Sequence, residues 1–433
     1  MISKEEIKTL LDNSSFKVSN RLRIGMWAFL AIGVLSFVAG IFTGHADLAW
    51  QALLINTLFF TGVTHAGIMF SVIFTITDAK WGRPIKRFAE AMGSFIPVSW
   101  ILFGVLFFGG HYFFEWMDHD KVIHTKEAWL NYSFFVKRNV VMILLTGVLS
   151  LYYVKVAMRV DIGLANSVLP NYLNPFATRI GGEYGDHEEE IASYKNKSRL
   201  LAPWLGFIYA LMTSLIAFDW IMSIDQEWFS TMFGVQYLVS NIMGASAILM
   251  IVSGIARSKF KLEDYISIDR YHDNSKLTFA FSLLWTYMIF SQVIVIWYAN
   301  LPEETPYMLL RMKTPEWAPV FWLIFVVLFL VPFWGLMSKT ACRSIWFSRI
   351  IAVIVLVGIW LEKYFLVVPS LQENALSAGG GHGGGFTGLH INLLDIGIAL
   401  GMIGAFILSY LWVLQRVPIV PIADEHFFKK AHH

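Results

Sequence analysis

Cysteine and charge are the scarcest features of this 433-residue sequence. Its single cysteine, Cys342, excludes a disulfide within the chain and an iron–sulfur cluster held by cysteines of this chain alone. The haem-attachment pattern Cys-x-x-Cys-His is absent, and so are the phosphate-binding, dinucleotide-binding and zinc-protease motifs of soluble enzymes. Charged residues make up only 15% of the chain, against about 25% in soluble domains. The sequence also lacks a basic domain that would bind nucleic acid.

Long hydrophobic runs dominate what is present. Hydrophobic residues make up 56% of the chain and aromatic residues 16%, with 17 tryptophans, which is typical of a protein with two aromatic interfacial belts. About 20 apolar residues cross a bilayer core as an α-helix. The sequence therefore predicts an all-α integral membrane protein with about ten transmembrane helices. We place these spans at 24–42, 49–77, 88–113, 139–159, 201–223, 232–256, 277–300, 317–338, 345–368 and 391–415.

The spans divide the chain into five parts. A polar N-terminal segment covers 1–23, four spans cover 24–159, and a hydrophilic connection covers 160–200. Six further spans cover 201–415, and a tail covers 416–433. Most of the 33 Lys and Arg residues fall in the two terminal segments and in the connections on the same side of the membrane. Because positively charged connections stay in the cytoplasm, we expect a multi-pass topology with both termini cytoplasmic.

Acidic residues near the non-cytoplasmic ends of the spans are the first candidates for chemistry. A charged group inside the bilayer costs about 2.5–3.5 kcal/mol, so such groups usually mark a pathway or a ligand site. Asp219 lies near the end of span 5, Asp225 lies in the following turn, and Asp395 lies one turn into span 10. Their carboxyl groups would accept protons, orient a bound hydroxyl or pair with a basic partner. The structural alternative is that Asp225 caps span 6.

His65 is the only histidine near a membrane midplane in the predicted spans. Ser71 and Thr75 follow it on the same span towards the cytoplasm. Histidine titrates near neutral pH and is a natural proton relay between two half-channels. A buried histidine that bonds only to a carbonyl or a threonine explains the residue equally well.

Span 7 carries a short polar stripe. Tyr287 and Ser291 are four residues apart and share a helix face, and Gln292 lies on the neighbouring face. Such a stripe would hydrate a channel or form hydrogen bonds between helices, and the second explanation is slightly favoured.

Three segments of the chain resemble one family of respiratory membrane proteins. They are FDWIMSIDQEWFSTMFG (218–234), FSQVIVIWYANLPEETPY (290–307) and YHDNSKLTFAF (271–281). They are similar to the membrane subunits of bacterial alternative complex III, which oxidises quinol and passes electrons to cytochrome c or a terminal oxidase. These subunits belong to the polysulfide-reductase membrane-subunit (NrfD-like) family. The resemblance extends over essentially all ten spans, and it is closer to the smaller F subunit than to the larger C paralogue.

The resemblance implies a fold, partners and a location. The fold is a pair of four-helix bundles, spans 2–5 and spans 6–9, flanked by spans 1 and 10. The expected partners are the C paralogue, an iron–sulfur protein, multihaem cytochrome c subunits, small membrane subunits, membrane lipids and, in some assemblies, a cytochrome oxidase. Haem and iron–sulfur clusters would belong to these partners, whereas this chain would bind no cofactor covalently and would contact quinone or menaquinol. The location would be the bacterial inner (cytoplasmic) membrane.

The leading hypothesis is a membrane subunit that supports electron transfer from quinol and translocates protons, with no redox centre, metal site or catalytic residue of its own. If spans 2, 5 and 7 approach one another, the proton route would pass Ser71, Thr75, His65, Tyr287, Ser291, Gln292 and Asp219. One alternative is a quinol-binding catalytic subunit with a pocket containing Asp219, Asp225 and Asp395, although the family's pocket is ascribed chiefly to the C paralogue. The other is a stand-alone secondary transporter, which helices broken at matching positions in two halves would favour.

Overall fold

The computed structural model of the chain describes residues 4–169, 175–182, 184–377 and 387–424. Within these residues every regular element is helical, and ten helical segments are long and apolar enough to cross a membrane. The protein is therefore an all-α, multi-pass membrane protein, as the sequence predicts. The end of the predicted tail, from 425 onwards, lies outside the described residues.

The crossing segments are single helices or pairs of consecutive helices. They are α2 (Asn20–Phe42), α3 (Ala46–Ile76), α4 with α5 (Lys86–Ala91 and Ile96–Phe108), α6 (Tyr132–Val168), α8 (His187–Trp220), α9 (Thr231–Lys259), α10 (Ile268–Ala299), α12 with α13 (Ala318–Phe325 and Val331–Leu336), α15 (Ile345–Ser377) and α16 (Leu393–Leu414). Shorter helices lie at their ends: α1 (Lys4–Ser14), α7 (Pro175–Gly181), α11 (Thr305–Met312) and α14 (Lys339–Arg343).

The crossing helices form two bundles with a flanking pair. Helices α3, α4–α5, α6 and α8 pack together, and α9, α10, α12–α13 and α15 form the second group. The two bundles meet where α9 packs against α3 and α8, and α15 also contacts α3. Helices α2 and α16 pack on each other and then on α3. This is the predicted architecture of two four-helix bundles and two flanking helices.

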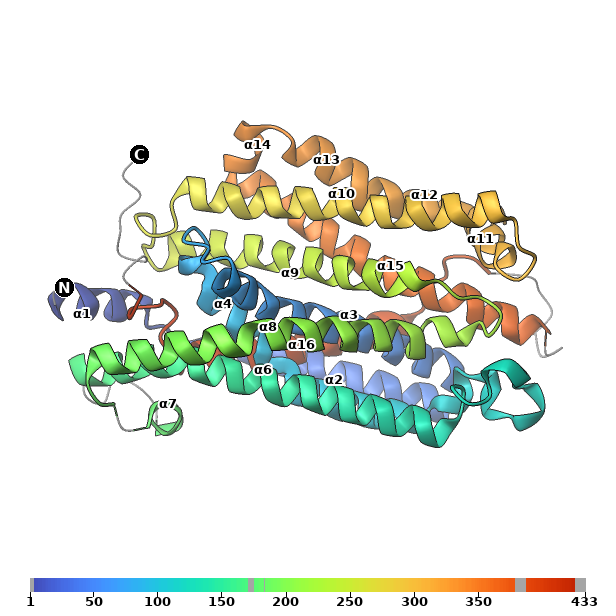
Figure 1. Cartoon of the computed structure of the whole chain (residues 1–433), viewed down its shortest axis with the longest axis horizontal. Helices are drawn as coiled ribbons and strands as arrows, with labels where there is room; N and C mark the ends of the chain where they lie inside the picture. Colours follow the sequence, from blue (N-terminus) through green and yellow to red (C-terminus); the bar gives the residue numbers. More distant parts are fainter. Residues whose placement is uncertain (1–3, 170–174, 183, 378–386, 425–433) are drawn as a thin grey trace.

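The first and last described residues, 4 and 424, lie at the same end of the molecule, together with α1 and α7 (Figure 1). We call this end the terminal end. Helix α11 lies at the far end of the long axis, which we call the opposite end (Figure 1). The crossing helices run side by side between the two ends, so a residue's position along its helix gives its depth.

Apolar side chains cover much of the outer surface of the bundle. On α2, Ile24, Trp27 and Leu35 are 66%, 58% and 66% exposed, and similar residues follow on α6, α10 and α15. A soluble protein rarely exposes a continuous apolar surface of this kind, whereas lipid chains match it. The exposed faces therefore fit a bilayer, and the polar groups gather inside the bundles or at their ends.

Proline interrupts two of the crossing segments. Pro97 opens α5, and the residues before it, Met92–Phe95, form a tighter 3₁₀ turn. In the eighth span a π-helical turn, Val326–Leu330, directly precedes the helix that contains Pro332. Proline lacks the amide hydrogen that would continue the helical bonding pattern, so a local change of helix type accompanies it. The two breaks fall in different positions of the two bundles.

A glycine pair sets the close approach of α2 and α16. A Cβ atom added to Gly33 would lie 2.4 Å from the Cα of Gly401, which leaves no space for any side chain. Small residues at helix crossings allow such backbone contact in membrane proteins.

We expect Gly33→Val to separate α2 from α16 and to destabilise the protein by about 1–3 kcal/mol, the usual cost of overpacking. The matched control is Gly25→Val on the same helix, because a Cβ at Gly25 meets no atom within 4 Å. Thermal unfolding in detergent would compare the two variants. Equal midpoints would show that the crossing tolerates a side chain.

Several helices are longer than the sequence indicates. Helix α6 continues to Val168 and α8 begins at His187, so the connection predicted at 160–200 is largely helical and also contains α7. Helix α15 runs to Ser377, well beyond the predicted end at 368. Hydropathy marks only the part of a helix that lies in lipid, whereas these helices extend past it.

Candidate functional site

Four charged side chains form a buried cluster near the terminal end of the first bundle. Lys86, Arg87, Glu90 and Asp161 are each less than 5% exposed. Arg87 donates to the carboxylate of Asp161 at 2.6 Å and pairs with Glu90, while Lys86 lies 3.9 Å from Glu90. The two cations balance the two acids, which offsets much of the cost of removing them from water.

Two predicted pathway residues lie beside this cluster. The Ser71 hydroxyl donates to Glu90 at 2.6 Å, and the Thr75 hydroxyl lies 2.7 Å from that of Tyr153 on α6. The Tyr153 hydroxyl is 3.0 Å from the carbonyl oxygen of Ser71. These side chains therefore join into one continuous polar network with Glu90, which is the hydrogen-bonded connectivity that a proton relay needs.

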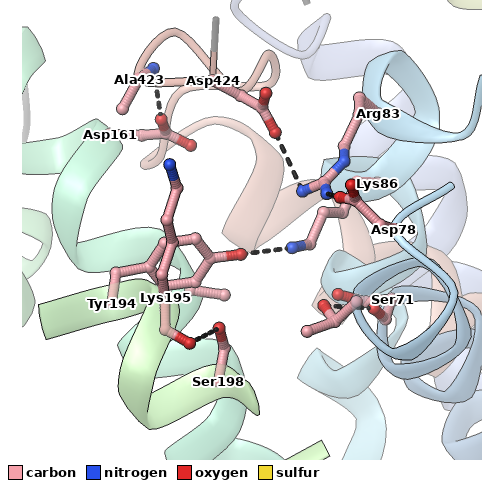
Figure 2. A network of polar contacts seen from close by, with 12 residues as sticks. Ser71, Asp78, Arg83, Lys86, Asp161, Tyr194, Lys195, Ser198, Ala423 and Asp424 are labelled. Carbon is pink, nitrogen blue, oxygen red and sulfur yellow. Dashed lines mark hydrogen bonds and ion pairs between the residues drawn. The ribbon is translucent and has the colours of Figure 1, made fainter. Parts of the chain in front are cut away.

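A cavity of about 440 Å³ at the terminal end reaches this network. Thr75, Lys86 and Asp161 line its inner wall, and Lys86 donates to the Tyr194 hydroxyl at 2.6 Å (Figure 2). The chain's final described residues lie along its edge: the Ala423 amide donates to Asp161 at 2.8 Å, and Asp424 pairs with Arg83 at 3.0 Å (Figure 2). Water in this cavity would touch the buried network directly.

The middle of the molecule contains polar atoms without partners. His65 is fully buried, and both its ring nitrogens lack a hydrogen-bond partner among the described residues. The same holds for the hydroxyls of Thr61 and Thr64 on the same helix. Buried polar groups almost always have a partner, which is often an ordered water. This stretch of α3 is therefore where we expect water inside the protein.

The partnerless atoms continue across the interface between the two bundles. Asn241 on α9 packs directly on Gly62 of α3, and its side-chain amide also lacks a partner among the described residues. One turn along α9, the Tyr237 hydroxyl donates to the Leu58 carbonyl of α3 at 2.9 Å. The segment of α3 from Ser71 to Leu58 is about 20 Å long, and polar groups lie along its whole length. We call this series of polar groups the polar strip. It begins at Glu90 and Ser71, passes His65 and Asn241, and reaches Tyr237 in the second bundle.

A buried ion pair lies where this strip enters the second bundle. Glu362 and Lys363 on α15 are 2% and 0% exposed, and the ammonium lies 3.0 Å from the carboxylate. Lys363 also donates to Ser240 at 3.0 Å and lies 4.2 Å from the centre of the Tyr237 ring. Neighbouring residues in a helix normally point apart, so the surrounding side chains hold this pair together.

The carboxylate of Glu362 is saturated with donors. Trp285 of α10 donates to it at 2.7 Å and Gln236 of α9 at 3.3 Å, and Ser240 and Lys363 also bond to it. A charged group deep in a membrane protein usually marks a pathway or ligand site. In the sequence, Glu362 and Lys363 fall near the end of span 9, which was placed at 345–368. Because α15 extends to Ser377, the pair instead lies near the middle of its helix.

From Glu362 the polar groups continue to the opposite end. Gln292 donates to Gln236 at 2.6 Å and accepts from Ser230 at 3.1 Å. A cavity of about 50 Å³ adjoins the two glutamines and also touches Tyr307, and this volume is sufficient for water. Burial raises the pKa of Tyr307 to about 12, so its hydroxyl keeps its proton at neutral pH.

The other two residues of the predicted span-7 stripe do not take part. Tyr287 is 59% exposed on the outer surface, and the Ser291 hydroxyl donates to the Met288 carbonyl of its own helix at 2.8 Å. Of the three predicted residues, only Gln292 faces the bundle interior. Helix α10 packs mainly on α9 and then on α13 and α14, and α3 is not among its main neighbours.

Asp219 is held in a separate structural cluster. Arg138 of α6 binds both of its carboxylate oxygens, at 2.7 and 2.8 Å, and Asn139 donates to it at 2.6 Å. Trp129 adds a further bond at 3.2 Å, and its ring lies 4.1 Å from the Arg138 guanidinium. A bidentate arginine pair of this kind fixes a carboxylate and satisfies its charge. Among the described residues, no hydrogen bond joins His65 to Asp219, and the polar groups beyond His65 continue across the bundle interface towards Glu362.

The two remaining acids accept bonds from nearby backbone amides, but the structural alternative that Asp225 caps α9 is wrong, because the N-cap of that helix is Ser230. Asp225 accepts bonds from the amides of Glu227 and Trp228 at 3.1 and 3.2 Å, and it therefore shapes the turn before α9. Asp395 is buried and accepts from the Asn392 amide at 2.8 Å, as part of a capping box at the start of α16. Each carboxylate thus has a local structural role.

In comparisons with known proteins, no family model and no curated protein sequence matches the chain. Among the described residues, no group of three or more His, Cys, Asp and Glu side chains could hold a metal ion.

Proposed function

We propose that this chain is an integral membrane subunit of a bacterial respiratory complex that oxidises quinol, and that it conducts protons while its partners carry the electrons. The resemblance of the segments at 218–234, 271–281 and 290–307 to alternative complex III subunits supports the assignment to such a complex. The observation that carries the proton role is the polar strip, which extends from the cavity at the terminal end to the opposite end.

The strip has three parts in series. Glu90, Ser71 and the adjoining cavity form the first, and the partnerless groups around His65 form the second. The Glu362–Lys363 pair with the two glutamines forms the third. The excess of Lys and Arg in the terminal segments and their side's connections supports a cytoplasmic location for the terminal end. Protons would thus enter from the cytoplasm and leave at the opposite side, driven by quinol oxidation in the partner subunits.

The alternatives have less support. A quinol pocket in this chain would need a free carboxyl group near the opposite end, whereas Asp219 is saturated by Arg138, Asn139 and Trp129. Helix breaks at matching positions in the two halves of the chain would support a secondary transporter. Here the breaks lie in the second helix of one bundle and the third helix of the other.

Isolation of the native complex through an affinity tag on this chain tests the proposal. We expect haem and iron–sulfur proteins to co-purify, and the reconstituted complex to move protons when quinol is added. If the chain instead purified alone and transported a solute by itself, the proposal would be wrong.

His65 offers a direct test of the central part of the strip. We expect His65→Leu to fold normally, because the ring nitrogens have no partner among the described residues and leucine suits the buried site. Proton translocation should fall by about 10²-fold, the lower range for loss of a proton-transfer group. The matched control is His111→Leu, since His111 is exposed near the opposite end.

The measurement is the proton-to-electron ratio of the complex in sealed vesicles, together with quinol oxidation in uncoupled vesicles. An unchanged ratio in His65→Leu would assign His65 to packing and remove it from the pathway.

A further inference from the structure

A large apolar groove lies on the lipid-facing side of the first bundle. Its volume is about 720 Å³, and it lies between α2, α5, α6 and α16, with α7 at its edge. Its walls include Trp27, Pro97, Leu151, Phe176, Ile180 and Trp412. The rings of Phe176 and Trp412 meet edge to face, with 4.7 Å between their centres. Helix α7 thus closes the terminal end of the groove with an aromatic contact.

A second, basic depression of about 230 Å³ adjoins this groove across α6. Lys155, Arg159 and Lys197 line it, and Glu190, paired with Arg159 at 2.7 Å, is the one acid among the described lining residues. The remaining polar groups of its lining are Tyr152, Ser193 and Tyr194. The depression therefore carries an excess of positive charge.

Lys155 belongs to both depressions. It lines the apolar groove on one side and the basic depression on the other, and its side chain is exposed. Within the part of the chain that the structure describes, the Lys155 ammonium has no ion pair or hydrogen bond, although it lies on a membrane-crossing helix. A lysine near the end of a crossing helix extends its ammonium to the level of the lipid headgroups, where an anionic headgroup would supply a counter-charge.

From this arrangement we propose that the two depressions bind one phospholipid with an anionic headgroup. The acyl chains lie in the apolar groove between α2, α6 and α16, and the phosphate lies against Lys155 at the entrance to the basic depression. The charge is complementary, because basic clusters at a membrane surface attract anionic lipids. The groove also borders Glu90, so a bound acyl chain shields the buried charged cluster from the bilayer.

A quinone is the other amphiphile that would fit an apolar groove. Its head is uncharged, so it would leave the Lys155 ammonium without a counter-charge. The net positive charge of the second depression therefore favours the anionic lipid. Of the strip residues, Glu90 borders the apolar groove but His65 and Glu362 do not, and the lipid proposal does not require Glu90 to move a proton.

The test measures lipids that co-purify with the intact complex, by mass spectrometry after mild detergent extraction. We expect Lys155→Gln to retain about fivefold less phosphatidylglycerol than the unmodified protein, as the loss of one basic contact implies. Lys155→Arg should keep the lipid. Lys137→Gln is the matched control, because Lys137 is an exposed lysine near the other end of the same helix.

A second variant tests the apolar half. Ala405 lines the groove on α16, so Ala405→Phe should fill the space and displace the lipid while Lys155 stays in place. Added phosphatidylglycerol should raise the thermal unfolding midpoint of the unmodified complex and of Lys137→Gln, but not of Lys155→Gln or Ala405→Phe; phosphatidylcholine should raise none of them.

Three outcomes would overturn the proposal. One is equal phosphatidylglycerol retention in Lys155→Gln and the unmodified complex. The second is a quinone, and not a phospholipid, that co-purifies and is lost in Ala405→Phe. The third is a crosslink from position 155 to another subunit, which would show that a protein covers the groove.

Discussion

Replacement of the buried pair Glu362–Lys363 should abolish proton translocation and leave quinol oxidation intact. In the variant Glu362→Gln/Lys363→Met both charges disappear together, and the side-chain volumes change little. Replacing a buried ion pair by uncharged groups of similar size is often neutral or stabilising, so the protein should fold. The double variant leaves no titratable side chain at the position of the pair, which lies between His65 and Gln292 in the polar strip. The proton flux should therefore fall by about 10²-fold or more. The proton-to-electron ratio in sealed vesicles measures this loss.

The single variant Glu362→Gln serves a different purpose. It leaves the Lys363 ammonium buried without its carboxylate, and an unpaired buried charge costs about 3–5 kcal/mol. We expect this variant to unfold at a lower temperature than the double variant. Glu316→Gln is the control for both, because Glu316 is exposed. A folded double variant with an unchanged proton-to-electron ratio would remove the pair from the pathway.

The number of spans was predictable from the residues, because bilayer thickness sets the length of an apolar helix, whereas the two-bundle architecture was expected only from the family resemblance. The depth of Glu362 was not predictable. The hydrophobic run ends near Pro369, yet α15 continues through this proline to Ser377. Arg311 of α11 donates to the Leu366 carbonyl at 3.1 Å and to Ser370 at 2.9 Å. Neighbouring donors of this kind let a membrane helix continue past proline, and no local pattern reveals them.

Long-range pairing was the second feature that the sequence could not show. Ser71, Thr75, His65 and Gln292 were identified because they are polar groups inside apolar spans. Arg138 gave no such signal, because it lies at the start of a span, where a basic residue is ordinary. Only the packing of α6 on α8 brings Arg138 to Asp219, where the guanidinium pairs with the buried carboxylate.

Removal of Arg138 should therefore destabilise the protein strongly. In Arg138→Leu the fully buried Asp219 carboxylate loses its bidentate partner and keeps only the bonds from Asn139 and Trp129. Breaking a buried pair by removing one partner costs about 3–5 kcal/mol. Thermal unfolding in detergent should show a large fall of the midpoint.

The double variant Arg138→Leu/Asp219→Leu distinguishes structure from chemistry at this site. If Asp219 only anchors α8 to α6, removal of both charges should restore most of the stability, because no unpaired charge remains. Quinol oxidation and the proton-to-electron ratio should then match those of the unmodified complex. A stable double variant that had lost quinol oxidation would instead place Asp219 in a quinol pocket, and the saturated hydrogen bonding of its carboxylate would have to be released when quinol binds.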